Sequence, residues 1–186
     1  MSFSKSHTFD ELNDSTTYWT IWVRAQSIWK GVTMKTNKFR GYNIIFFDDT
    51  NSRIHAFIEP QICPKFEEEL QEGCIYIIRN FSVKYYNRDE TNRAIRNEKH
   101  IYFNQDITLK KDSEKVIRIE PQSFDLFLLS NVDKLKGDNR FLSDVVGLLE
   151  DSPTKIAYRK EKVEKHNVKF TLTDGRYYWT ITIHLL

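Results

Sequence analysis

One short segment, residues 53–58 (RIHAFI), alternates polar or aromatic residues with apolar ones. Alternate residues of a β-strand point to opposite faces, so its even-numbered residues would form an apolar face. Arg53, His55 and Phe57 would then share the solvent-facing side. Bases stack on aromatic rings while cationic side chains bind phosphates, so this face is typical of a single-strand-binding surface. The alternative is that Phe57 covers a loop or caps the mouth of a barrel.

Basic residues surround this segment, although the formal net charge of the chain is only +2. Residues 18–58 carry six basic residues, Arg24 and Lys30 among them, against two acidic ones. Residues 79–100 carry six basic residues against three acidic ones, whereas residues 59–72 carry five acidic residues and one basic residue. Cationic segments interleaved with aromatic residues favour nucleic-acid binding over an ordinary solvated surface.

Residues with catalytic or metal-binding potential do not form a recognisable motif. The sequence contains no GxSxG elbow, GxxxxGK[ST] phosphate loop or HExxH pair, and its five histidines are scattered. Asp48 and Asp49 fall in a predicted turn, where Asp is favoured for its backbone hydrogen bonds. Cys63 and Cys74 form no CxxC pair, so we expect two reduced thiols. The sequence predicts a protein that is not an enzyme and needs no cofactor and no metal.

The composition, with 40% hydrophobic and 14% aromatic residues, predicts a folded chain. Its first residues lack the basic start and apolar core of a signal peptide, and no apolar run reaches the length of a membrane span. We therefore expect a soluble intracellular protein that does not enter a membrane.

Short β-branched and aromatic runs separated by polar turns predict an all-β fold. After the third run, Phe66 and Leu70 lie four residues apart among glutamates, which predicts one short acidic helix over 64–73. Three strands, a helix and two strands is the order of a small closed β-barrel. The predicted strands are 18–29, 42–47, 53–58, 74–86 and 99–105.

The remaining residues predict a linker and a second unit. The segment PQSFDLFLLSN predicts a short helix opened by Pro121 and Ser123. Three further strands follow, and Asp174-Gly175 predicts a tight hairpin between the last two. They are expected at 144–152, 166–173 and 176–183.

The order of WKG at 29–31, IIFFDDTNSRIHAFI at 44–58 and KYY at 84–86 resembles a known family. It is similar to the first single-strand-binding OB domain of the replication protein A large subunit, especially its plant relatives. The resemblance implies a five-stranded Greek-key OB barrel with one short helix, a linker helix and a partial second OB unit. The implied division is 1–16 extension, 17–111 first OB domain, 112–140 linker with short helix, and 141–186 partial second OB domain.

The same resemblance implies roles for particular residues. The family's stacking aromatic falls on Phe57 and its phosphate-binding arginine on Arg53. The family's lysine after the helix falls on Lys84, and Tyr86, or else Tyr85, matches the second stacking aromatic. In the second unit, His184 stands where the family usually carries a tryptophan.

These observations predict non-catalytic single-stranded DNA binding in the nucleus, in DNA replication, repair and recombination. RNA is an alternative ligand. Expected partners are subunits of the replication protein A type, or a second copy bound through the incomplete second unit. The alternative function is a truncated paralogue that binds proteins and not DNA.

Overall fold

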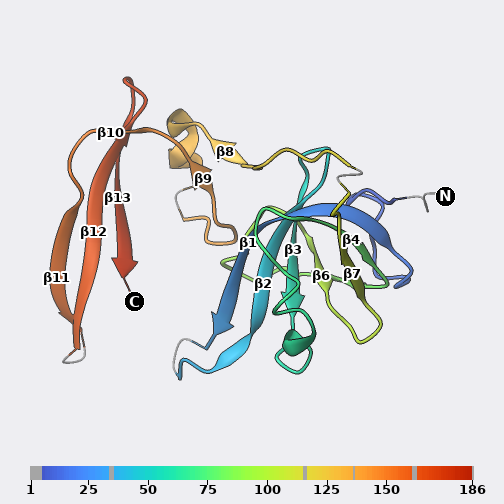
Figure 1. The fold of residues 1–186 in the computed structure, drawn as a ribbon. Coiled ribbons are helices and arrows are strands. Elements are labelled where there is room, and N and C mark those ends of the chain that lie inside the picture. Colours follow the sequence, from blue (N-terminus) through green and yellow to red (C-terminus); the bar gives the residue numbers. More distant parts are fainter. Residues whose placement is uncertain (1–5, 34–35, 115–116, 136, 161–162, 186) are drawn as a thin grey trace. The chain divides into compact units, whose positions relative to one another are not determined.

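The chain forms two compact units, which Figure 1 shows as a ribbon. The computed structural model describes residues 6–33, 36–114, 117–135, 137–160 and 163–185. The first unit contains residues 1–123 and also 139–142, and the second contains 124–138 and 143–186. Part of the segment expected to be a linker therefore packs with the first unit.

A seven-stranded sheet in the order β5-β6-β3-β2-β1-β4-β7 forms the first unit. Strands β1, β2, β3 and β6 confirm the predicted runs, although their bounds differ by a few residues. The bounds are β1 Thr20–Val32, β2 Phe39–Phe47, β3 Arg53–Ile58, β4 Ile75–Arg79, β5 Ser82–Tyr85, β6 Lys99–Tyr102 and β7 Thr108–Lys111.

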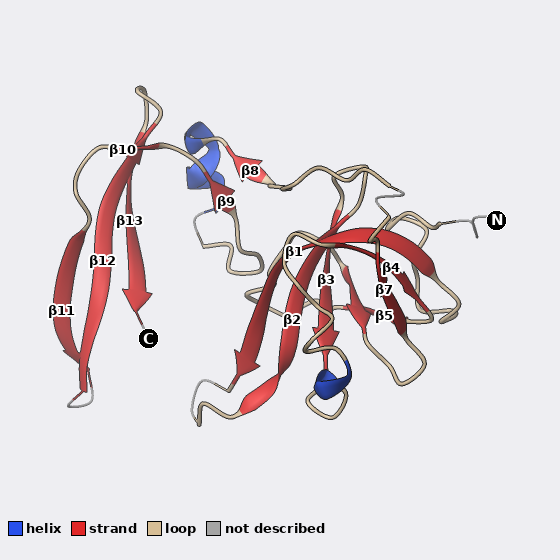
Figure 2. Cartoon of the chain, viewed as in Figure 1, coloured by secondary structure: helices blue, strands red, loops and turns tan. Residues whose placement is uncertain are grey.

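The single strand expected over 74–86 is instead two strands, β4 and β5. Asn80 breaks it, with a left-handed φ of 59°. Strand β5 is the edge strand at one end of the sheet. Strand β4 pairs with β1 and with β7, and β7 is the edge strand at the other end. Only Asn80 and the buried Phe81 separate β4 from β5 in sequence. The sheet must therefore curl until its two edges approach each other. Figure 2 shows this curled, mostly β architecture.

The acidic helix expected over 64–73 is much shorter than predicted. It consists of the 3-10 helix η1, Cys63–Lys65, followed by turns. Tyr76 prevents a helix from continuing to Gly73: its hydroxyl donates to the Glu69 carbonyl and accepts from the Gln71 N–H, both at 2.8 Å. These bonds satisfy backbone groups that a continuing helix would have paired internally.

The core of the first unit lies inside the curled sheet. The even-numbered residues of β3 are fully buried, as the alternation predicted. The segment expected to be an extension contributes Phe9 and Leu12, which are 3% and 1% exposed. Lys99 holds this segment, because its Nζ donates to three backbone carbonyls of residues 9–12. Other fully buried side chains are Ile21, Val23, Ile44, Phe46, Tyr76, Ile78, Phe81 and Ile101.

The second unit is also built mainly of strands. The helix expected from Pro121 is absent there: the chain forms the short strand β8, Leu126–Phe127, and the 3-10 helix η2, Leu129–Leu135. Strand β11, Thr154–Lys160, was not predicted. No helix in the described part of the chain is long and apolar enough to span a bilayer. The other strands are β9 Asp144–Val145, β10 Leu148–Leu149, β12 Val163–Thr173 and β13 Tyr178–Leu185.

The hairpin predicted at Asp174-Gly175 joins β12 to β13. Gly175 has a left-handed φ of 88°, which favours glycine. The Asp174 carboxylate accepts hydrogen bonds from the N–H groups of Arg176 and Tyr177 at 2.9 and 2.8 Å. These bonds hold the pKa of Asp174 below its usual value.

Candidate nucleic-acid interface

One surface of the sheet carries a row of aromatic and amide side chains across four strands. Trp29 of β1 pairs with Asn43 of β2, Asn43 with Phe57 of β3, and Phe57 with Tyr102 of β6. Paired residues project from the same face of a sheet, so the four side chains lie side by side. A second row on this face contains His55, His100 and Lys84, through the pairs His55–His100 and Lys84–His100. We call these two rows the candidate face.

Phe57 occupies the centre of the candidate face and is half-buried. Its ring lies 5.5 Å from the Tyr102 ring, between centroids, with the planes inclined by 47°. Lys84 places its Nζ 3.4 Å from the centroid of the Tyr102 ring. A cation therefore lies over a ring that neighbours Phe57. The sequence predicted a cation beside an aromatic ring on this face, but from Arg53 and Phe57 and not from Lys84 and Tyr102.

Gly41 of β2 makes room for the Phe57 ring. A Cβ built on Gly41 would lie 3.1 Å from Cζ of Phe57 and only 2.0 Å from the carbonyl oxygen of Ile58. The φ of Gly41 is 127°, a conformation that residues with side chains rarely adopt. Glycine is thus required at this position, both by the backbone and by the close approach of β3.

A hydrogen-bonded chain of three side chains lies next to Phe57. The His55 Nδ1 lies 2.5 Å from the Tyr86 hydroxyl, and its Nε2 lies 3.1 Å from Oδ1 of Asn43. The Trp29 ring stacks on the His55 ring at 6.0 Å and 19°. The imidazole is thus fixed in position by contacts with three neighbours.

Tyr86 is already packed against protein groups. Its ring centroid lies 4.4 Å from that of His100 and 4.8 Å from the Arg93 guanidinium carbon. Arg93 is 8% exposed, and it donates to the carbonyls of Asn87 and Glu90 at 2.7 and 3.2 Å. The sequence-predicted second stacking residue is therefore part of a packed cluster in this structure.

Burial controls the protonation of the candidate face. It lowers the pKa of His55 to about 4, with a further contribution from His100, and it also lowers the pKa of His100. Burial raises the pKa of Tyr86, and together with a hydrogen bond to Glu59 it raises the pKa of Tyr102 to about 12. At neutral pH both imidazoles are uncharged, so the positive charge of this face comes from its lysine and arginine residues.

Five of the eight predicted site residues gather in one region. Arg53, at the start of β3, lies two residues before His55 and therefore on the same face of the strand. The other four are His55, Phe57, Lys84 and Tyr86.

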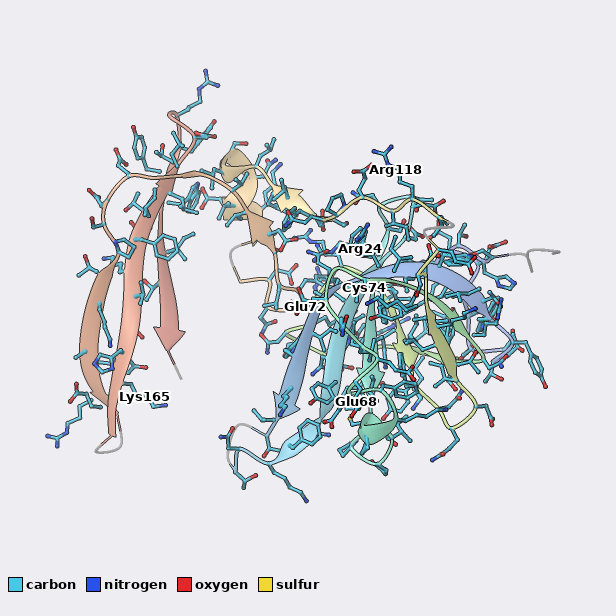
Figure 3. The ribbon with its side chains drawn as sticks, in the orientation of Figure 1. Arg24, Glu68, Glu72, Cys74, Arg118 and Lys165 are labelled. Atoms are coloured by element: carbon cyan, nitrogen blue, oxygen red, sulfur yellow. The ribbon has the colours of Figure 1, made fainter. Side chains whose placement is uncertain are left out.

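The remaining three predicted site residues are placed differently. Arg24 lies on β1 (Figure 3), where it donates to the backbone carbonyl of Gly73 and, at 2.5 Å, to that of Ile119. Lys30 alternates with Trp29 and lies on the other face, with its Nζ 6.0 Å from the Tyr42 ring. His184 is in β13 of the second unit, opposite Asn167, and its side chain lies outside the described part of the structure.

Sequence reasoning about the site missed four residues of the candidate face. Trp29, Asn43, His100 and Tyr102 come from three strands, and only the pairing register brings them next to Phe57. The alternation within each strand could have shown which face each residue occupies. It could not have shown which residue of the neighbouring strand lies opposite.

Within the described residues, no group of three or more His, Cys, Asp or Glu side chains could hold a metal ion.

Residues 10–127 match a family model described as a domain of unknown function, DUF223. This match covers more than half of the chain. The chain belongs to the DUF223 family. No curated protein matches it in sequence.

Solved structures similar to this DUF223 chain include replication protein A and an archaeal OB domain. A replication protein A heterotrimer bound to ssDNA matches with a TM-score of 0.54 and 16% identity, over 96% of this chain and 41% of that one. DNA-binding domain A of replication protein A from S. cerevisiae matches with a TM-score of 0.43 and 21% identity, over 57% and 92%. An OB domain from Thermoplasma acidophilum matches with a TM-score of 0.41 and 17% identity, over 60% and 90%. The DUF223 chain spans less than half the length of the heterotrimer chain that it matches.

Proposed function

We propose that this DUF223 chain binds single-stranded DNA, without catalysing a reaction, through an OB barrel formed by its first unit. The observation that carries the proposal is the row of Trp29, Asn43, Phe57 and Tyr102 across four strands, with Lys84 beside it. The similarity in fold to a replication protein A chain, in a structure bound to ssDNA, supports the same function.

The candidate face would bind a strand by two physical effects. Bases stack on the rings of Phe57 and Trp29, because aromatic faces pack against any base. Lys84 lies over the neighbouring Tyr102 ring, and Arg53 lies further along the same face of β3. Both side chains would neutralise phosphates, which gives affinity with little dependence on sequence. A duplex hides its base faces inside the helix, so this mechanism favours single strands.

The test is a fluorescence titration of the full chain with a labelled single strand, the corresponding duplex and an RNA strand of the same sequence. We expect the DNA single strand to bind more tightly than the duplex at low salt. If three or four phosphates are neutralised, the log–log dependence of affinity on salt should have a slope of about −2 to −3. Absence of binding at low salt would reject the proposal, and tighter binding of the RNA strand would identify RNA as the ligand.

A second candidate function is protein binding through the second unit. Several large apolar side chains of this unit are exposed, including Leu148 at 71%, Leu128 at 69% and Val146 at 63%. Exposed apolar side chains that gather on one surface are typical of interaction sites, which is what we propose for this unit. The partner would be a second copy or a subunit of the replication protein A type. Sedimentation of the full chain should then show a concentration-dependent dimer that Leu148→Ser weakens, and a monomer at all concentrations would exclude self-association.

A cellular role follows from the resemblance in sequence. We propose that the protein acts in the nucleus, in DNA replication, repair and recombination. Imaging of the tagged full chain before and after DNA damage tests this role. Exclusion from the nucleus under both conditions would contradict it.

A further inference from the structure

Asn43 lies at the centre of the candidate face with only one end of its amide engaged. It is paired directly with Phe57 on one side and with Trp29 on the other. A base stacked on Phe57 would have its edge within reach of the Asn43 side chain, because paired residues have Cβ atoms about 5 Å apart. Asn43 is therefore positioned to contact the base itself and not the phosphate.

The placement of the Asn43 amide oxygen sets the tautomer of His55. Oδ1 faces Nε2 of His55, so Nε2 must carry the proton and donate it. The neutral imidazole then accepts at Nδ1, and the Tyr86 hydroxyl donates to it. Burial favours this neutral form. The result is an amide whose oxygen is turned towards His55 and whose NH₂ group is directed elsewhere.

The NH₂ group of Asn43 points over Gly31. A Cβ built on Gly31 would lie 2.9 Å from Nδ2 of Asn43, so the amide occupies the space that a side chain at this position would need. Nδ2 has no hydrogen-bond partner within the described residues, whereas Oδ1 has one. Two N–H donors are thus presented over Gly31, on the same face of the sheet as Phe57.

We propose that Asn43 is a specificity-determining residue that favours bases with carbonyl oxygens over adenine at the Phe57 stacking position. This inference rests on the proposed function. An asparagine that reads adenine uses both ends of its amide, with Oδ1 accepting from the adenine amino group. Here Oδ1 is turned to His55, so adenine keeps only a bond from Nδ2 to one of its ring nitrogens, whereas a carbonyl oxygen such as those of thymine accepts from Nδ2 without needing Oδ1. Tyr86 and His55 act as positioning residues for Asn43.

The experiment compares oligo(dT), oligo(dU) and oligo(dA) of about 12 nucleotides with the full chain and its variants. Asn43→Ala should lower the dT-to-dA affinity ratio about 3- to 10-fold, the effect of one lost hydrogen bond. The self-stacking of oligo(dA) does not affect this change, because it is the same for every variant. Oligo(dU) should respond as oligo(dT) does, since it has the same carbonyl oxygens without the methyl group.

Two further variants separate positioning from simple contact. Tyr86→Phe keeps the ring and removes only the hydroxyl, so it should lower the dT-to-dA ratio while binding of oligo(dA) stays within about twofold of the wild type. Gly31→Ala should displace the amide and lower the ratio in the same direction. Thr108→Ala, on the exposed strand β7, is the control and should leave the ratio unchanged.

The outcomes distinguish this inference from the proposed function. If the wild type binds all three strands and Asn43→Ala leaves the dT-to-dA ratio unchanged, the inference is wrong and the proposed function stands. If Asn43→Ala lowers the ratio but Tyr86→Phe does not, Asn43 contacts the base without the positioning that we infer, and that part is rejected. If the wild type binds none of the strands, the proposed function itself fails.

Discussion

The Phe141 ring packs against the guanidinium of Arg93, with 5.4 Å between its centroid and the guanidinium carbon. Three main-chain hydrogen bonds accompany this contact: Asn92 and Arg93 donate to the carbonyls of Asn139 and Arg140, and the Leu142 N–H donates to the Arg93 carbonyl. Residues 139–142, which lie between two segments of the second unit in sequence, therefore order the β5–β6 loop of the first unit.

Phe141→Ala should loosen the β5–β6 loop without unfolding the barrel. The loss of a cation–π contact and its packing should cost about 1 kcal/mol and lower the melting temperature by about 2–4 °C. Amide hydrogen exchange at Asn92 and Arg93 should become faster, since their N–H groups bond to this segment. Leu142→Ala is the matched control, because its side chain is 61% exposed. Equal exchange rates in both variants would contradict the role of Phe141.

Acidification should destabilise the protein through His55. The unfolded imidazole takes up a proton near pH 6.5, whereas burial lowers the folded pKa to about 4. The unfolded chain therefore binds more protons between these values, so the free energy of unfolding falls as the pH is lowered through this window. The loss is at most about 3 kcal/mol, and His100 adds to it in the same direction. Urea unfolding at about pH 7 and pH 5 measures this difference, which His55→Gln should reduce.

Gly41→Ala should be much more destabilising than the same change at Gly73. Both glycines have a positive φ, but a Cβ at Gly41 would collide with the Ile58 carbonyl, whereas a Cβ at Gly73 would have nothing within 4 Å. We expect a loss of about 1 kcal/mol for Gly73→Ala from backbone strain alone, and about 2 kcal/mol or more for Gly41→Ala. Thermal unfolding of both variants provides the comparison. Similar melting temperatures would show that β2 and β3 are not held as closely as described.

Lys84→Gln should weaken DNA binding and reduce its salt dependence. One neutralised phosphate on a single strand accounts for about 0.7 of the log–log slope, so the slope should become shallower by that amount. Lys110→Gln is the matched control, because it removes the same charge from β7, which is not one of the strands that form the candidate face. Titrations at several salt concentrations measure both slopes. An equal change in the two variants would indicate a general effect of net charge.

The sequence predicted those parts of the fold that depend on local patterns. The alternation in residues 53–58 correctly separated the buried residues from Phe57, and Asp174-Gly175 correctly located a hairpin. The turn predicted at Asp48 is also present, since its carboxylate accepts bonds from the N–H groups of Thr50 and Ser52. Each of these features is determined by residues that are close in sequence.

Features that depend on distant contacts could not be predicted in this way. The acidic helix was expected from the spacing of Phe66 and Leu70, but the Tyr76 hydroxyl binds the backbone that would have continued it. Asn80 gives little local sign of the break between β4 and β5, which the closure of the sheet requires. The position of Trp29 beside His55 likewise depends on register and not on any motif.

The most direct test of the proposed function is one titration and one melting curve for Phe57→Ala. If Phe57 is a stacking surface, the variant should bind single-stranded DNA more weakly by about 1–3 kcal/mol, with a nearly unchanged melting temperature. Tyr85→Ala is the matched control, because it removes a 48% exposed ring from the other face of β5 and should leave affinity unchanged. Wild-type affinity in Phe57→Ala, or a large fall in its melting temperature of the kind that a buried Phe→Ala change produces, would contradict the account.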